Sequence, residues 1–297
     1  MTIDKSAINS LADRAVYLVL DWSFLGTWKH VVTPESSTEL KTTKRTVKSD
    51  SIGAMRRLNY RVRSALRHYA LNSLFRPGVY VIPLESVQHI DDVLQLAVTD
   101  METIREQIVS EWPEIIQDGR DRLGDLFDAS DYGSGESAAK EFEMSYRYAP
   151  IAETPTILKH VAADTYKADL ERTRKETEKE LQTFRDSLRI TLLEIVENMR
   201  KTLTKPDGEK RVFGARFFKR LNEFLETFDG KNLSDDAALQ DVVQQLQLVS
   251  NGTDVATLKT SADMQQSLDT SLSQITESMA SMLQDDDGRM IDLSQAS

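Results

Sequence analysis

Three short runs of hydrophobic residues in the first half of the chain predict β-strands. Apolar and aromatic residues dominate residues 15–25 and 79–83, and both stretches are bounded by glycine or proline, as buried strands often are. Residues 141–149 alternate apolar with polar side chains, the pattern of a strand with one buried face. We expect these segments to form a small three-stranded sheet.

Two helices are expected to pack on this sheet, and the first is strongly amphipathic. It runs from about Ile52 to Leu74, with Asp50 or Ser51 as the N-cap residue. At about 100° per residue its two faces differ sharply in character. The apolar face carries Met55, Leu58, Val62, Ala65, Leu66 and Tyr69, and the opposite face carries Arg56, Arg57, Arg61, Arg63, Arg67 and His68, with Tyr60 and Leu71 among them.

The second helix is expected to begin at Glu85 or Ser86 and to continue to near Glu111. Trp112-Pro113 then predicts a kink or a break, because proline cannot donate the backbone hydrogen bond of a helix interior. A further helix follows, with apolar residues Ile115, Ile116, Leu123, Leu126 and Phe127.

Two segments of this half are predicted to be loops. Residues 31–43 are rich in Thr, Ser and Pro, and residues 131–136 contain Gly-Ser-Gly, which favours flexibility. That glycine motif does not predict a phosphate site, because no strand precedes it and no Lys-Ser/Thr pair follows it.

A long helix from about Thr156 to Thr204 is the main feature of the second half, and Thr154 and Pro155 suit its start. Its middle, residues 171–180, is polar on every side, so we expect that part to be exposed or to cross between two packed bodies. An apolar stripe at helix-packing spacing follows. It consists of Leu181, Phe184, Leu188, Leu192, Ile195, Met199 and Leu203.

The predicted partner of this stripe is the aromatic segment 212–228, joined to the long helix by a short loop at 205–210. Ser234 is expected to cap the next helix, whose inward residues are Leu239, Val242, Val243, Leu246 and Val249.

After residue 250 the composition shifts to Ser, Thr, Gln and Asp, and one narrow apolar stripe remains. The stripe is Met264, Leu268, Leu272, Ile275, Met279 and Met282. A helix with so little apolar surface is marginal alone and folds against a partner. Two alternatives stay open: the stripe binds another copy of the chain or a different protein, or it folds back on the chain's own long helix.

These elements predict an α+β protein that is predominantly α-helical. We expect an α+β domain at residues 1–150, a long-helix and helical-hairpin region at 151–250, and a tail at 251–297.

Composition narrows the class of protein further. The chain has 297 residues, no cysteine and a net charge of −11. A disulfide scaffold and a thiolate zinc site are thereby excluded, and no run reaches the roughly 18 apolar residues of a membrane span. We expect a soluble, cytoplasmic protein that does not insert in a membrane.

The charge is unevenly distributed. Between Lys41 and Arg76 ten Lys/Arg face a single acidic residue, so this block carries +9 and the remainder of the chain −20. The arginines and Tyr60 of the first helix could hold phosphates and stack a base, which makes nucleic-acid binding one hypothesis. The alternative is a solvated face whose arginines pair with nearby carboxylates.

Clustered aspartates raise the question of a metal site. Asp118, Asp121, Asp125 and Asp128 share one helical face, and Asp131 lies just beyond. An EF-hand loop that starts at Asp128 fails, because Tyr132 and Ala139 stand where ligands belong. We therefore expect no metal and no cofactor, and a solvated acidic stripe or a docking face for the basic helix.

No nucleophile elbow, Walker motif, kinase set or dinucleotide-binding fingerprint occurs in the sequence. The four histidines, His30, His68, His89 and His160, show no zinc spacing. We therefore expect a protein without catalytic activity.

A resemblance rests on several motifs spread over about residues 10–250. They are a hydrophobic first run with a Trp, Trp112-Pro113, Leu123-Gly124-x-Leu126-Phe127, Asp131-Tyr132, and a strand that ends in Tyr148-Ala149-Pro150 before a long charged helix. This pattern resembles an uncharacterised domain family of bacteria and their phages, often encoded beside MoxR-type AAA+ ATPases and von Willebrand A proteins. The resemblance implies partnership with an ATPase and assigns no catalytic residue.

Our leading functional hypothesis is a non-catalytic adaptor or structural component of a protein assembly. Its partner contacts would be the tail residues Met264, Leu268, Leu272, Ile275 and Met279, with the polar middle of the long helix. The alternative is a nucleic-acid-binding protein that uses Arg56, Arg57, Tyr60, Arg61, Arg63 and Arg67.

Overall fold

The structure is a computed structural model, and it describes residues 11–31, 42–74, 76–151, 158–203 and 217–284. The chain forms two compact units. Residues 15–150 make the α/β unit, and residues 1–14 together with 151–297 make the helical unit. The predicted α+β class with mostly helical content is confirmed.

The α/β unit is built on an antiparallel sheet of four strands in the order β4-β5-β1-β6. The predicted strands are present as β1 (Ala15–Ser23), β5 (Val79–Pro83) and β6 (Glu143–Ala149). The short edge strand β4 (Leu71–Asn72) was missed, because Leu71 was assigned to the polar face of the preceding helix. In the structure Leu71 is buried and pairs with Val81.

A second sheet contains only β2 (Trp28–Val31) and β3 (Thr42–Arg45), which pair as an antiparallel hairpin. The predicted loop at residues 31–43 was therefore wrong at both ends, while residues 32–41 lie outside the described part of the chain. The strands escaped prediction because their Lys, His and Thr residues give no hydrophobic alternation.

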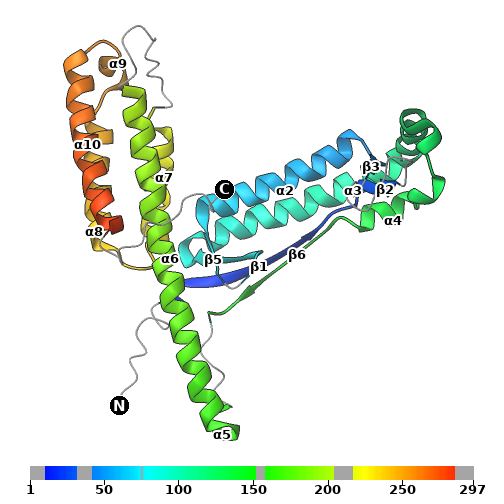
Figure 1. Ribbon diagram of the computed structural model, residues 1–297, viewed down its shortest axis with the longest axis horizontal. Coiled ribbons are helices and arrows are strands. Elements are labelled where there is room, and N and C mark those ends of the chain that lie inside the picture. Colours follow the sequence, from blue (N-terminus) through cyan, green and yellow to red (C-terminus); the bar gives the residue numbers. More distant parts are fainter. Residues whose placement is uncertain (1–10, 32–41, 75, 152–157, 204–216, 285–297) are drawn as a thin grey trace. The chain divides into compact units, whose positions relative to one another are not determined.

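Two helices lie side by side over one face of the four-stranded sheet (Figure 1). The first is α2 (Asp50–Tyr69). Its N-cap is Ser49, whose side chain accepts a hydrogen bond from the Ile52 N–H at 3.2 Å, rather than the predicted Asp50 or Ser51. It ends five residues before the predicted Leu74, because the chain leaves at Ala70 to form β4.

The second helix, α3 (Val87–Leu123), follows the 3-10 turn η1 (Leu84–Ser86) and continues for 37 residues. Of the predicted kink or break at Trp112-Pro113, the break is not observed, since Pro113 lies inside the helix. Proline removes one hydrogen bond, but Trp112 and Ile115 on either side of it are buried in the core, which holds both halves in place.

The chain after α3 forms the 3-10 turns η2 (Gly124–Leu126) and η3 (Ala129–Asp131) and the short helix α4 (Gly135–Lys140). Residues 131–136 are thus not one flexible loop as predicted. Ser134 caps α4 through a hydrogen bond from the Ser137 N–H at 3.1 Å.

One core joins the sheet to both helices in this unit. Its members come from β1, α2, β5, α3 and β6 together with α4. They include Leu18, Leu20, Met55, Leu58, Val62, Leu66, Ile82, Ile90, Leu94, Met101, Ile108 and Phe142. The predicted apolar face of α2 is confirmed, with Ala65 and Tyr69 half-buried at its margin.

The helical unit contains the predicted long helix, observed as α5 (Leu158–Val161) and α6 (Ala163–Leu203). The proposed start at Thr154-Pro155 and the loop at 205–210 lie outside the described residues. The remaining helices are α7 (Lys219–Lys231), α8 (Ala237–Gly252), α9 (Val255–Leu258) and α10 (Ala262–Gln284).

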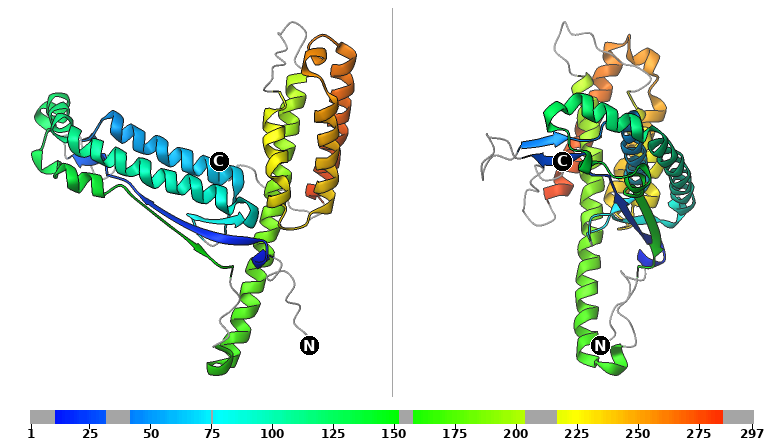
Figure 2. Two further views of the ribbon diagram at one scale, coloured as in Figure 1. Left: turned by 180° about the vertical axis from the view of Figure 1, so that it is seen from behind. Right: turned by 90° about the vertical axis from the view of Figure 1, so that its right-hand side faces the viewer.

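The apolar stripe of α6 packs against α7, α8 and α10, which gather around its C-terminal part (Figure 2). Stripe residues from Phe184 to Leu203 are buried, and Leu181 is half-buried. The expected partner segment is only partly described, but Phe218, Leu221 and Phe228 are buried in this core. The inward residues predicted for α8 are also confirmed.

The polar middle of α6 differs from the expectation at two positions. Thr177 and Glu180 are buried, whereas most of their neighbours between residues 171 and 180 are exposed. The absence of apolar residues in this segment concealed the burial, because the prediction followed hydrophobicity alone.

The tail stripe folds back on the chain's own helices. Leu268, Leu272, Ile275 and Met279 on α10 are buried with residues of α6 and α8, and Met264 and Met282 pack at the edge. Of the two alternatives, this is the one observed. In this structure the stripe is not available to another protein.

A buried ion pair ties three helices of this unit together. Arg189 of α6 donates to both carboxylate oxygens of Asp236, at 2.7 and 3.2 Å, and to the Met282 carbonyl on α10 at 2.8 Å. Asp236 is the N-cap of α8, in place of the predicted Ser234, and accepts the Leu239 N–H at 3.1 Å.

Candidate nucleic-acid interface

The outer face of α2 is strongly basic. Arg56, Tyr60, Arg63 and Arg67 follow one another at intervals of four, three and four residues, which places them in one stripe along the helix. Arg57 and Arg61 lie beside that stripe. All six side chains are exposed, and Tyr60 is 67% exposed.

The contacts of these arginines are mostly with neutral groups. Arg56 donates to the Thr27 hydroxyl at 3.0 Å, and Arg63 donates to the Asn59 side chain at 3.1 Å and to the Tyr80 hydroxyl at 3.3 Å. The Arg67 guanidinium lies over the Tyr60 ring, 5.5 Å from its centroid.

The sequence left open that these arginines pair with carboxylates of the same chain, and such pairing is observed only in part. Arg61 forms an ion pair with Asp100 of α3. Within the described residues no carboxylate lies within ion-pair distance of Arg56, Arg57 or Arg63. The positive charge of those arginines therefore remains available to an anion.

The acidic stripe at the end of α3 does not dock on these arginines. Asp118 pairs with Arg122 one turn away, and Asp121 accepts a hydrogen bond from Gln117 at 2.9 Å. Asp128 caps η3 through Ser130, and these hydrogen bonds hold the pKa of the Asp128 carboxyl below its usual value. Across the described ranges, no group of three or more His, Asp or Glu is placed to hold a metal ion.

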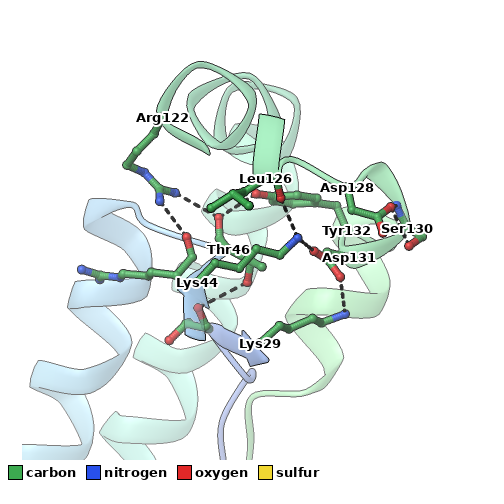
Figure 3. A network of polar contacts seen from close by, with 11 residues as sticks. Lys29, Lys44, Thr46, Arg122, Leu126, Asp128, Ser130, Asp131 and Tyr132 are labelled. Carbon is green, nitrogen blue, oxygen red and sulfur yellow. Dashed lines mark hydrogen bonds and ion pairs between the residues drawn. The ribbon is translucent and has the colours of Figure 1, made fainter. Parts of the chain in front are cut away.

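Asp131 instead belongs to a network that fixes the β2–β3 hairpin (Figure 3). Its carboxylate pairs with Lys44 at 2.6 Å and with Lys29 at 3.3 Å, and Lys44 also donates to the Leu126 carbonyl at 2.7 Å. The lysine side chains of one face of the hairpin are thereby attached to the turns η2 and η3.

Arg122 and Tyr132 hold the end of the hairpin in the same network. Arg122 donates to the carbonyls of Arg45 and Thr46 at 2.6 and 3.1 Å, and the Tyr132 hydroxyl donates to the Thr46 carbonyl at 2.8 Å (Figure 3). Burial raises the pKa of the Tyr132 phenol. The phenol therefore stays protonated near neutral pH and keeps donating this hydrogen bond.

Sequence reasoning missed one candidate residue of this surface. Trp28 of β2 is 58% exposed, and it directly follows Thr27, the residue bonded by Arg56. The signal was present in the run Trp-Lys-His beside a basic block, but the segment was assigned no structure of its own.

Within the described residues, no helix has the length and apolar character needed to cross a membrane. Comparisons with protein-family models, curated proteins and solved structures found no match. The resemblance to the domain family encoded beside AAA+ ATPases thus stays a hypothesis.

Proposed function

We propose that this protein binds nucleic acid through the outer face of α2. The observation that carries the proposal is the exposed stripe of Arg56, Tyr60, Arg63 and Arg67. Within the described residues, Arg56 and Arg63 have no carboxylate within ion-pair distance, and their other contacts are with neutral groups. Guanidinium groups bind phosphate bidentately, and an exposed phenol among them offers a face on which a base can stack.

The spacing of the stripe suits a phosphate backbone. Arg56 and Arg67 are eleven residues apart, which corresponds to about 16 Å along the helix. Phosphates of one strand repeat every ~3.4 Å along a duplex axis, so the stripe covers roughly five of them. Several arginines can therefore contact one strand at the same time.

The proposal is tested by replacing Arg57 and Arg67 with Gln. Both side chains are exposed on the outer face of α2. Each lost phosphate contact is expected to weaken binding about tenfold, because hydrogen bonds to charged groups contribute about 1.5 kcal/mol or more. The measurement is fluorescence anisotropy of labelled 20-nucleotide single strands and duplexes in low salt.

The matched control replaces Arg172 and Lys175 with Gln. Both residues are exposed on α6, so the net charge changes by the same amount on a different surface. Binding should be nearly unchanged in this control. Equal affinities of the Arg57/Arg67 variant and the wild type would contradict the proposal, as would an absence of binding to both probes.

The adaptor role expected from the sequence remains a second hypothesis. Its apolar contact residues are buried in the helical unit, so support for it now rests on charge alone. The surface of α2 is basic, and the adjacent α3 carries nine acidic and three basic residues. A protein partner, including an AAA+ ATPase, would be recognised by co-purification that persists after nuclease treatment.

A further inference from the structure

The β2–β3 hairpin extends the surface of α2 with an exposed aromatic side chain. Arg56 donates from Nη2 to the Thr27 hydroxyl at 3.0 Å, and Trp28 is the next residue of the chain. The beginning of the arginine stripe is thereby fixed close to an indole that is 58% exposed.

The register of the hairpin places its aromatic and its lysine residues on opposite faces. Trp28 lies directly opposite Arg45, and Lys29 lies opposite Lys44. Paired residues of an antiparallel ribbon point to the same side, and neighbours along a strand point to opposite sides. Lys29 and Lys44 turn to Asp131 (Figure 3), so Trp28 and Arg45 share the other face.

The indole is presented on a rigid base. Thr27 and Thr46 are buried, and the Thr46 N–H donates to the Thr27 carbonyl at 2.9 Å. Arg122 and Tyr132 both donate to the Thr46 carbonyl. A preorganised aromatic side chain loses little conformational entropy when a ligand stacks on it.

We propose that the nucleic acid bound at this surface is single-stranded, with one base stacked on Trp28 and the backbone following the arginines toward Tyr60. This inference rests on the proposed function. Bases of a duplex are already stacked and paired, whereas bases of a single strand can stack on exposed indole and phenol rings. Aromatic side chains beside a basic track are the features that proteins use for such strands.

The test uses the full chain and tryptophan fluorescence. Of its three tryptophans, Trp112 is buried and donates from Nε1 to the Gly133 carbonyl at 2.8 Å, and Trp22 is half-buried. Oligo(dT) and oligo(rU) are each expected to quench part of the tryptophan emission. The oligonucleotide that binds with the higher affinity shows whether deoxyribose or ribose is preferred. The Trp28→Phe variant should keep most of the affinity but lose the quenching.

The Trp28→Ala variant should bind either single strand at least about tenfold more weakly than the wild type, since stacking of a base on an aromatic side chain contributes at least that factor. Its affinity for a duplex should not change. Leu96→Ala is the control, because Leu96 is an apolar side chain on α3 that is 57% exposed. Its affinity for single strands should equal that of the wild type.

Two results separate the inference from the function on which it rests. If duplex and single strand bind equally well and Trp28→Ala has no effect on either, the single-strand inference is overturned while nucleic-acid binding stands. If the wild type binds neither probe at low salt, both proposals are overturned.

Discussion

At the residue scale, close packing explains a glycine inside a helix, where glycine is usually unfavourable. A Cβ atom added at Gly119 of α3 would lie 2.2 Å from the Tyr132 hydroxyl oxygen and 2.8 Å from Cζ of that ring. The ring cannot easily retreat, because its hydroxyl is bonded to the Thr46 carbonyl. Gly119 therefore leaves room for the phenol that anchors the hairpin.

We expect Gly119→Ala to lower the free energy of unfolding by about 1–3 kcal/mol, since the steric clash outweighs the better helix propensity of alanine. Urea denaturation measures the change. Gly53→Ala in α2 is the matched control, because its nearest neighbour is the flexible end of Arg57 at 3.2 Å. That variant should gain up to about 1 kcal/mol. A Gly119→Ala protein as stable as the wild type would show that the phenol is not packed as described.

At the element scale, the helical unit depends on a polar contact within an apolar bundle. Arg189 and Asp236 are both buried, and together they connect α6 to the start of α8 and the end of α10. Burial alone raises the pKa of the Asp236 carboxyl. The hydrogen bonds from Arg189 and Leu239 and the charges of Arg189 and Arg185 outweigh that effect, so the pKa is lowered below its usual 3.8.

We expect Asp236→Asn to destabilise the protein by about 3–5 kcal/mol at pH 7, because asparagine still caps the helix but leaves the arginine buried without a counter-charge. A carboxyl with a lowered pKa contributes stability above its unfolded pKa and loses it as the pH falls through the folded pKa. The difference between wild type and variant should therefore shrink below about pH 4.

The control for this prediction is the double variant Arg189→Met/Asp236→Asn, which should recover part of the loss since no charge is then left unpaired. Thermal and urea unfolding at several pH values provide the measurement. A difference that stays constant down to pH 2 would exclude the ion pair as its cause.

Elements with strong hydrophobic patterns were predictable from the sequence, and elements held by polar contacts were not. The stripes of α2 and α6 and the strands β1, β5 and β6 contain enough apolar residues to show their period. The hairpin β2–β3 is fixed by Lys44, Arg122 and Tyr132, whose partners lie more than 70 residues away in the sequence. No local pattern reveals such contacts.

The candidate site shows the same division. The arginines on the outer face of α2 were predictable, because helical periodicity separates them from the buried face. Their partners were not, since the contact of Arg56 with Thr27 and the ion pair of Arg61 with Asp100 depend on how elements pack. Trp28 was missed because its segment, without hydrophobic alternation, was assigned no structure.

At the scale of the whole molecule, a small basic surface belongs to a chain with a net charge of −11. The block from Lys41 to Arg76 carries +9, so a nucleic acid is attracted to one region and repelled by the remainder of the protein. Such a protein is expected to contact few phosphates, within one limited region of its surface.

We expect a correspondingly shallow salt dependence. Three to four neutralised phosphates give a slope of about −2 to −3 in a plot of log K against log salt for a single strand. Anisotropy titrations at salt concentrations from about 25 to about 200 mM measure this slope. The Arg57→Gln/Arg67→Gln variant should reduce the slope by about 1, whereas a slope near zero would mean that phosphates are not the contacted groups.

The contact of Arg189 with α10 also has a consequence for how the helical unit folds while the chain is being synthesised. Arg189 leaves the ribosome well before Asp236, and Met282 follows 93 residues after Arg189. Until both have emerged, the growing α6 must keep this guanidinium in water, which opposes early burial of the adjoining apolar stripe. Because burying an unpaired charge is costly, we expect the bundle to close only once its last helix is present, and nascent helical units to remain open to chaperones and proteases until then.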